Sequence, residues 1–222
     1  MAIVNGGMGS MLSGKVGGLV YVQLNGQTIT RKAPRHKKDS WTPRMLQNQQ
    51  RFREVNSFCG QFKYSVIPQI WNGAALANFS KVSSFGRVSE KKMSGYALFL
   101  KSNMAAFAPD GSLGDAKKLT FSTGKLNMPQ ELIAGRSEAE VSIIEVSWEK
   151  ELHVGGIHLR DELMVISAAD GLYSDIMATG IPREAMHGTF ELPTPPERAT
   201  HIYLFFGSTD RRDYSESVCC EV

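Results

Sequence analysis

Two stretches of the chain carry residues whose types and spacing come close to known chemistry. Gly9–Lys15 reads GSMLSGK, close to the phosphate-binding loop G-x-x-x-x-G-K-[ST], but Val16 stands where a hydroxyl must hold Mg²⁺. His153 and His158 are five residues apart, which does not place them on one helical face, and two glycines between them favour a loop. Neither stretch therefore predicts a nucleotide site or a metal site.

The remaining reactive side chains also point away from catalysis. The three cysteines are an odd number, and Cys219 and Cys220 are adjacent, so the short peptide between them disfavours a disulfide. Reduced thiols are the reading typical of a protein made in the cytosol. The neighbouring carboxylates Asp161 and Glu162 are interpreted as ordinary charges at a strand edge. We therefore predict a protein that is not an enzyme and that needs no cofactor and no metal.

Charge is distributed unevenly along the chain. Residues 1–102 carry 15 Lys or Arg and 3 Asp or Glu, a net charge of +12, whereas residues 103–222 carry 10 and 19, a net charge of −9. Such asymmetry favours an anionic partner for the first half or mutual attraction of the two halves. The candidate contacts to an anionic partner are the basic residues Arg31, Lys32, Arg35, Lys37, Lys38, Arg44 and Arg51.

This basic segment spans residues 31–53, and its first part, residues 31–41, has two interpretations. It is either a solvated linker or an electrostatic contact with nucleic acid or an acidic protein surface. Trp41 is the only aromatic residue near its centre, so the sequence lacks the stacking platform that is typical of single-strand binders.

The elements that position this segment are a hairpin and a helix. Asn25-Gly26 separates two β-rich runs, 19–24 and 27–32, and is the strongest short signal for a two-residue turn. Downstream, Thr42 is a good N-cap and Pro43 suits the first helical position. The predicted helix ends near Pro68, and we expect one apolar face of it in the core: Met45, Phe52, Val55, Phe58 or Cys59, Phe62 and Val66.

The rest of the first half is patterned less strongly. Residues 72–88 favour a loop or a short helix, and Ser89 can cap a second helix over 90–107. Pro109-Asp110-Gly111 then ends that helix with turn chemistry, and the charge balance changes sign nearby. We therefore expect two domains, residues 1–112 and 113–222.

The second half alternates with period two. Strands are predicted near 119–123, 139–148, 162–168, 172–177, 188–192, 200–206 and 215–221. About seven short strands without helical periodicity predict an antiparallel β-sandwich of the fibronectin III or immunoglobulin type. Trp148 is expected in its core. The fold class predicted for the whole chain is α+β: a hairpin and two helices, followed by this sandwich.

One family resemblance arises from the first half. The segment GKVGGLVYVQLNGQTITRKAP followed by TPRMLQNQQRF, and later KKLTFSTGKL, resembles a family of Bacteroidota proteins of uncharacterised function. The positions that carry the likeness are Gly14, Lys15, Gly17, Val20, Arg31, Pro34, Thr42, Gln49, Arg51 and Phe52. The resemblance implies a bacterial source and this architecture, and it implies no chemistry.

Composition narrows the function to a few classes. Hydrophobic content of 42% and charged content of 21% are ordinary for a globular protein. We expect neither a signal peptide nor a membrane span, so a cytoplasmic location is the default. The predicted function is a structural or protein-interaction role, as a self-associating subunit of a larger assembly or with another protein. The alternatives are nucleic-acid binding through residues 31–53 and ligand binding by the sandwich loops.

Overall fold

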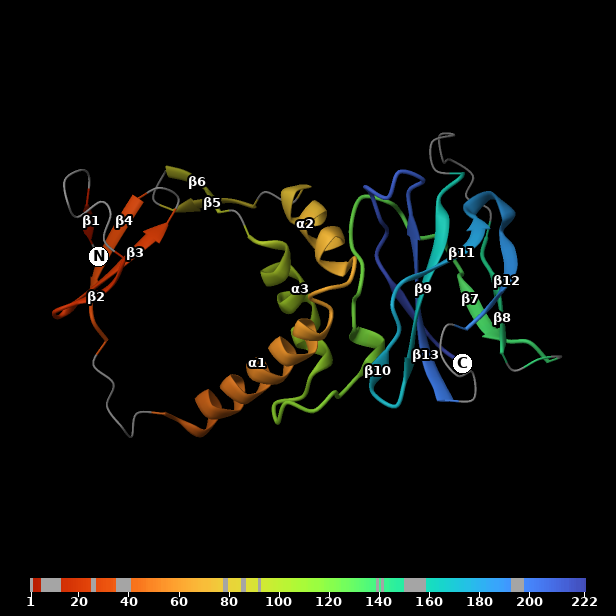
Figure 1. Ribbon diagram of the computed structural model, residues 1–222, viewed down its shortest axis with the longest axis horizontal. Coiled ribbons are helices and arrows are strands. Elements are labelled where there is room, and N and C mark those ends of the chain that lie inside the picture. The colour runs from red at the N-terminus through yellow and green to blue at the C-terminus, as the bar shows by residue number, and fades with distance from the viewer. Residues whose placement is uncertain are drawn as a thin grey trace. The chain divides into compact units, whose positions relative to one another are not determined.

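The protein is a mixed α+β structure made of two compact units. The computed structural model describes residues 2–4, 13–24, 27–34, 41–77, 80–84, 87–91, 93–138, 140, 142–149, 159–192 and 198–222. The first unit comprises Met1–Pro43 and the second Arg44–Val222. Three α-helices and several antiparallel sheets lie in the described residues (Figure 1).

The first unit is a four-stranded antiparallel sheet with the order β1-β4-β3-β2. Its strands are β1 (Ala2–Val4), β2 (Gly14–Val16), β3 (Leu19–Leu24) and β4 (Gln27–Lys32). Strands β3 and β4 form the predicted hairpin with Leu24 opposite Gln27, while the Asn25-Gly26 turn lies outside the described residues. The resemblance of GSMLSGK to a phosphate loop also fails at its described end, since Gly14–Val16 forms a strand where the motif requires a helix.

The described side chains of this sheet do not form an apolar core. Its fully buried members are Thr28 and Thr30, and Gln23 donates a hydrogen bond to the Thr28 hydroxyl at 2.9 Å. Val16, Leu19 and Val22 are all exposed. A β-sheet draws its stability from burial of one face, so this unit gains little from the apolar side chains that the structure describes.

The second unit begins with three helices, α1 (Pro43–Gln61), α2 (Ile67–Ala77) and α3 (Gly95–Asn103). The prediction of one helix ending near Pro68 was wrong, since α1 ends at Gln61 and a new helix, α2, begins at Ile67. Pro68 is the second residue of α2, where its missing N–H costs nothing. Ser65 caps α2 by accepting a hydrogen bond from the Ile67 amide at 3.2 Å. The cap of α3 is Ser94 instead of the predicted Ser89.

A further hairpin separates α2 from α3. Strands β5 (Ser80–Ser84) and β6 (Arg87–Lys91) pair antiparallel, so the prediction of a loop or short helix over residues 72–88 holds for the end of α2 and was wrong from Ser80 onward. The small and polar residues of this segment favoured a loop. Val82 and Val88 each alternate with polar neighbours, however, and this period-two pattern suits two strands joined by a short connection.

Two antiparallel sheets follow. The central sheet contains β9 (Glu162–Ala169), β10 (Leu172–Tyr173), β11 (Met177–Pro182), β13 (Ala199–Gly207) and β14 (Val218–Glu221). The small sheet has the order β12-β8-β7 and contains β7 (Ile133–Arg136), β8 (Ile143–Ser147) and β12 (His187–Glu191). Most of these strands lie within a few residues of their predicted positions. Strand β7 was not predicted, and the prediction near 172–177 covers parts of both β10 and β11.

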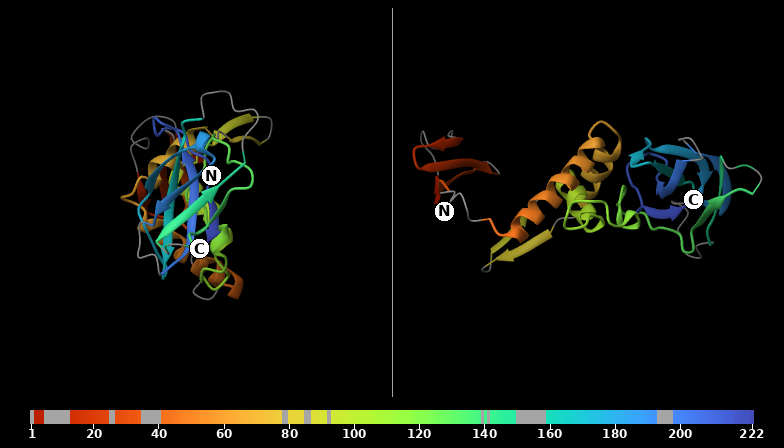
Figure 2. Two further views of the ribbon diagram at one scale, coloured as in Figure 1. Left: turned by 90° about the vertical axis from the view of Figure 1, so that its right-hand side faces the viewer. Right: turned by 90° about the horizontal axis from the view of Figure 1, so that it is seen from below.

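The central sheet is buried on both faces. Along β13, Ile202, Leu204 and Phe206 belong to a core shared with the small sheet, whereas Tyr203 and Phe205 belong to a core shared with the helices. Strand β9 alternates in the same way. The second unit is therefore layered, with helices on one face of the central sheet and the small sheet on the other (Figures 1 and 2).

The strand predicted near 119–123 does not form. Phe121 is fully buried, but its amide donates to the Ser217 hydroxyl at 2.9 Å and its carbonyl accepts the Trp71 indole N–H at 2.9 Å. The side chain of Asn103, also fully buried, bonds both the amide and the carbonyl of Thr120 at 2.9 Å. Because these side chains satisfy the backbone, the segment does not join a sheet.

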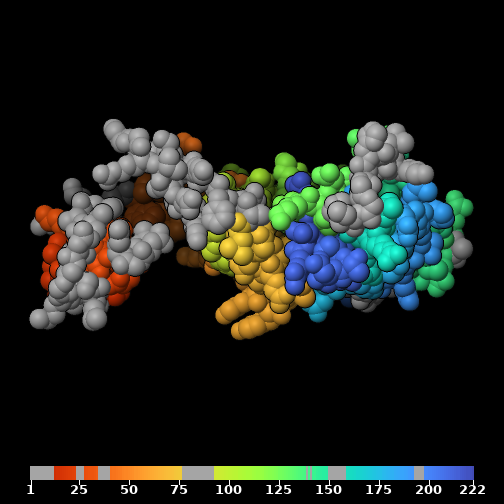
Figure 3. Space-filling model, turned by 90° about the horizontal axis from the view of Figure 1, so that it is seen from above, coloured from red at the N-terminus to blue at the C-terminus, as the bar shows by residue number. Residues whose placement is uncertain are grey.

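The helices and the C-terminal strands thus share one core, which crosses the domain boundary expected at residue 112. Phe58 of α1 and Phe62, just after it, pack edge-on against Phe121, which packs in turn against Tyr203 of β13. Helix α2 also lies directly against the C-terminal segment, with Gly73 facing the carbonyl of Arg212 (Figure 3). The compact units instead divide between Pro43 and Arg44.

Candidate interaction surface

The predicted basic contacts are distributed over both units. Arg31 and Lys32 are exposed at the end of β4 in the first unit, and Arg44 is exposed at the start of α1 in the second. Arg35, Lys37 and Lys38 lie outside the described residues. The described candidate contacts to an anionic partner therefore lie on separate elements, and binding through each must be tested by its own substitution.

Arg51 has a structural contact. It is half-buried, and its guanidinium donates a hydrogen bond to the carbonyl of Met104, just after α3. The Met104 carbonyl also accepts the Phe107 amide at 3.4 Å, and its bond to Arg51 joins the middle of α1 to the end of α3. Arg51 is therefore less available to an external anion than Arg44.

The first half of α1 is exposed almost all round. Val55 is the first residue of the helix to enter the core, followed by Phe58, Cys59 and, after the helix, Phe62. The prediction that Met45, Phe52 and Val66 belong to the same buried face was wrong, since all three are exposed. Helical periodicity identifies the apolar face of a helix. How much of that face is buried depends on how far the other elements of the core extend along the helix.

The exposed residues of α1 form a face of mixed character. Met45, Gln49, Phe52 and Arg53 follow the spacing i, i+4, i+7, i+8, which places them along one side of the helix. The exposed fraction of the Phe52 side chain is 52%. We refer to these four residues as the α1 face. It combines apolar contact area with one fixed positive charge, as is common at protein interfaces.

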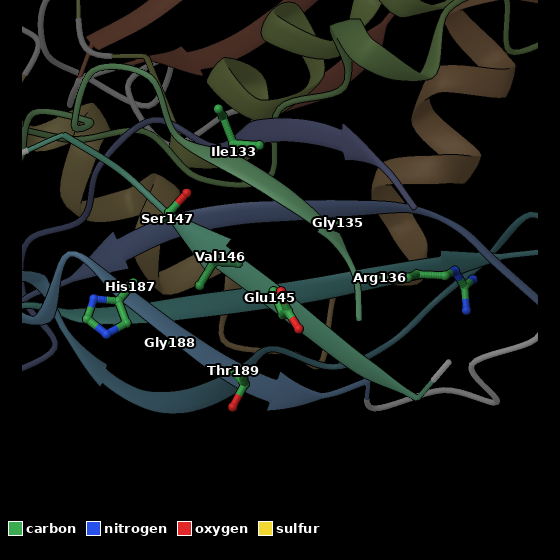
Figure 4. Close-up of a pocket in the computed structure, with 9 residues that line it drawn as sticks. All are labelled: Ile133, Gly135, Arg136, Glu145, Val146, Ser147, His187, Gly188 and Thr189. Carbon is green, nitrogen blue, oxygen red and sulfur yellow. The ribbon is translucent and has the colours of Figure 1, made fainter. Parts of the chain in front are cut away.

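The outer face of the small sheet contains a shallow depression of about 390 Å³ (Figure 4). Two cross-strand rows form it, Ile133–Ser147–His187 and Gly135–Glu145–Thr189. A Cβ atom at Gly135 would meet no atom within 4 Å, so the missing side chain leaves open space beside Glu145. Ile133 projects at the edge of the depression with 65% of its side chain exposed.

Carboxylates lie on and around this outer face, with Glu145 and Glu191 on its strands. The exposed carboxylates on the strands and adjoining turns of the small sheet are Glu131, Glu138, Glu140, Glu145, Glu149, Glu184 and Glu191. The half-buried Arg136 also lines the depression, and its guanidinium donates a hydrogen bond to the carbonyl of Ala199 at 2.8 Å. The negative potential of such a group steers cationic partners toward the sheet.

The thiols and buried phenols of the second unit are held in their protonated forms. Burial raises the pKa of Cys59 to about 12 and that of Cys219 to about 11. Burial likewise raises the pKa of Tyr173 to about 12 and that of Tyr203 further still. A thiol acts as a nucleophile only as the thiolate, so burial disfavours the reactive form of these two cysteines.

One buried ion pair was missed at the sequence level. Asp161 and Arg183 are both almost fully buried, with a guanidinium nitrogen 3.5 Å from a carboxylate oxygen. Arg183 also lies 4.9 Å from the ring centre of Phe206, and its carbonyl accepts the Trp148 indole N–H at 3.0 Å. Trp148 is therefore in the core as predicted, while the interpretation of Asp161 as a strand-edge charge was wrong. No local sequence signal pairs residues so far apart.

A smaller apolar cavity lies where the three helices meet. Its volume is about 140 Å³, and Cys59, Trp71 and Phe99 contribute to its wall. Tyr96 stands at its edge and donates a hydrogen bond to the Asn56 side chain at 2.8 Å. The wall presents no charged group except Lys63, so the cavity has no polar set that would orient a substrate.

Metal-ligating residues do not gather in the part of the chain that the structure describes, where no group of three or more His, Cys, Asp or Glu is placed to hold an ion. His153 and His158 lie outside it. No helix in the described ranges is long and apolar enough to cross a membrane.

No protein-family model matches the sequence, and a comparison with curated proteins finds no match. The resemblance to the Bacteroidota family stays a prediction.

Proposed function

We propose that this chain is a non-catalytic building block that works by binding protein, as a subunit of a larger assembly. The observation that carries the proposal is the exposed first half of α1, where Met45 and Phe52 stand beside Arg53 on a helix whose second half buries one face in the core. Exposed apolar area of this kind is costly in water and typical of an interaction site.

The second unit supports this role as a rigid scaffold. We infer that the central sheet and the small sheet together form a β-sandwich of the fibronectin III or immunoglobulin type, with about seven strands. Antiparallel pairing and the shared core of Ile144, Val146, Phe190, Leu204 and Phe206 support the inference. The helices would then cover the face that such a sandwich normally exposes.

Sedimentation velocity over a concentration series tests the building-block role. We expect the full chain at about 50 mM salt to sediment above its monomer mass of 24.5 kDa, increasingly so at higher concentration. Association should weaken toward 1 M salt, because exposed charge contacts are screened within ~3 Å at that ionic strength. A monomer at every concentration and salt would contradict self-assembly.

Nucleic-acid binding is the second candidate, favoured by the exposure of Arg31, Lys32 and Arg44. Fluorescence anisotropy with labelled single- and double-stranded DNA and with RNA tests it over a salt series. Each duplex phosphate contacted should contribute about −0.9 to the log–log slope, and a slope near −4 to −6 would match this basic segment. Absence of binding at about 50 mM salt would eliminate this candidate.

A further inference from the structure

The second unit carries two surfaces of opposite charge on opposite sides. The α1 face belongs to the helix layer, whereas the outer face of the small sheet lies beyond the central sheet (Figure 1). Because the central sheet and its two cores separate them, the two surfaces cannot meet within one second unit. The two surfaces can therefore meet each other only between copies of the chain.

We propose that the α1 face of one copy docks on the outer face of the small sheet of the next copy. This inference rests on the proposed building-block function and names the partner as a second copy of the chain. Arg53 opposes Glu145, and Phe52 occupies the space above Gly135 with Ile133 against its ring. The contact pairs a positive charge with a negative charge and an apolar side chain with an apolar side chain. This complementarity attracts the two copies and also fixes the register in which they dock.

Shape agrees with charge at this contact. The exposed length of α1 from Pro43 to Glu54 is roughly 18 Å at 1.5 Å per residue. A five-residue strand such as β8 spans roughly 17 Å, so the helix matches the length of the small sheet. A depression of about 390 Å³ also has room for a phenyl ring, because no side chain stands at Gly135.

The contact joins two different surfaces, so it is heterologous and does not close on itself in a dimer. Each copy offers one α1 face and one sheet face, which leads to rings or open filaments. A helix on a three-stranded sheet buries less than ~1,200 Å², the range of weak contacts. We therefore expect salt-sensitive association that grows with concentration.

Charge reversal on the full chain tests the contact. Glu145→Lys and Arg53→Glu are each expected to weaken association at least ~10-fold in sedimentation velocity at about 50 mM salt, since like charges then face each other. The combined variant Glu145→Lys with Arg53→Glu restores opposite charges and should recover association to within a few-fold of the original. Glu216→Lys is the control for Glu145→Lys, because it changes net charge by the same amount and sign on the exposed segment before β14.

Filling the depression tests shape separately from charge. Gly135 has ordinary backbone angles for a strand, so Gly135→Trp should fold normally and weaken association by blocking the seat of Phe52. Circular dichroism and the melting temperature verify folding of every variant. If the original chain associates and all of these variants associate equally well, the docking geometry is wrong while the building-block function stands. If the original chain is always a monomer, both fail.

Discussion

The two main sheets of this protein differ in how they are buried. Strands β9 and β13 of the central sheet have apolar side chains buried on both faces, and aromatic residues from the helices complete one of the two cores. The sheet of the first unit buries Thr28 and Thr30 among its described side chains and exposes Val16, Leu19 and Val22. The central sheet is stabilised by apolar burial on both of its faces, whereas the described part of the first sheet buries little apolar surface.

This difference indicates where the stability of the molecule originates. Burying a large apolar side chain contributes about 1.5–3 kcal/mol, so the second unit has ample favourable free energy from its two cores. A sheet whose described apolar residues are exposed or only half-buried gains less from folding alone. We expect substitutions in the two units to have very different effects, and the four predictions below test that contrast.

The largest effect is expected at Phe121. Phe121→Ala removes a fully buried ring that packs against Phe58, Phe62, Tyr173 and Tyr203, leaving a cavity between the helices and the central sheet. The free energy of unfolding should fall by about 3–5 kcal/mol, measured by urea denaturation. A loss below ~1 kcal/mol would mean that the helix layer does not pack on the sheet.

The buried ion pair gives the next largest effect. Asp161→Asn leaves the guanidinium of Arg183 buried without its charge partner and should cost about 3 kcal/mol in urea denaturation. The double variant Asp161→Leu with Arg183→Met removes both charges and should recover much of that loss. If the double variant is the less stable of the two, the pair contributes directly to stability and this reading is wrong.

Thiol reactivity distinguishes the packed helix layer from solvent. With its pKa raised to about 12, Cys59 is almost entirely a protonated thiol at pH 8.5, and its side chain is buried. Alkylation by iodoacetamide should be roughly a thousandfold slower than after unfolding, because only the thiolate reacts. Peptide mass spectrometry locates the label, with Cys59→Ser as the control. Rapid labelling in the native protein would show that the helices open readily.

The smallest effect is expected in the first unit. Val22→Ala trims an exposed side chain on β3 and should change the free energy of unfolding by less than about 0.5 kcal/mol. The matched substitution Val165→Ala on β9, where the side chain is fully buried, should cost several times more. Equal losses at the two valines would remove the contrast between the sheets.

Local sequence patterns predicted most of the elements correctly. The β3–β4 hairpin and strands β9 and β13 lie where Asn25-Gly26 and the β-rich runs indicate. The same patterns failed at residues 119–123, where side chains from distant elements satisfy the backbone, and at the serine-containing β5–β6 hairpin. Of the candidate contacts, Arg51 could not be judged from sequence, since its partner carbonyl at Met104 is 53 residues away.

The sequence alone determined the α+β class, the charge division between the halves and the helical and strand segments, because each depends on residues that are close along the chain. Only the tertiary structure decided that helices and strands share one core, that Asp161 meets Arg183, and that the first half of α1 stays exposed. These features depend on which layers cover which faces. That choice is made by the free energy of packing distant segments, and no local pattern contains it.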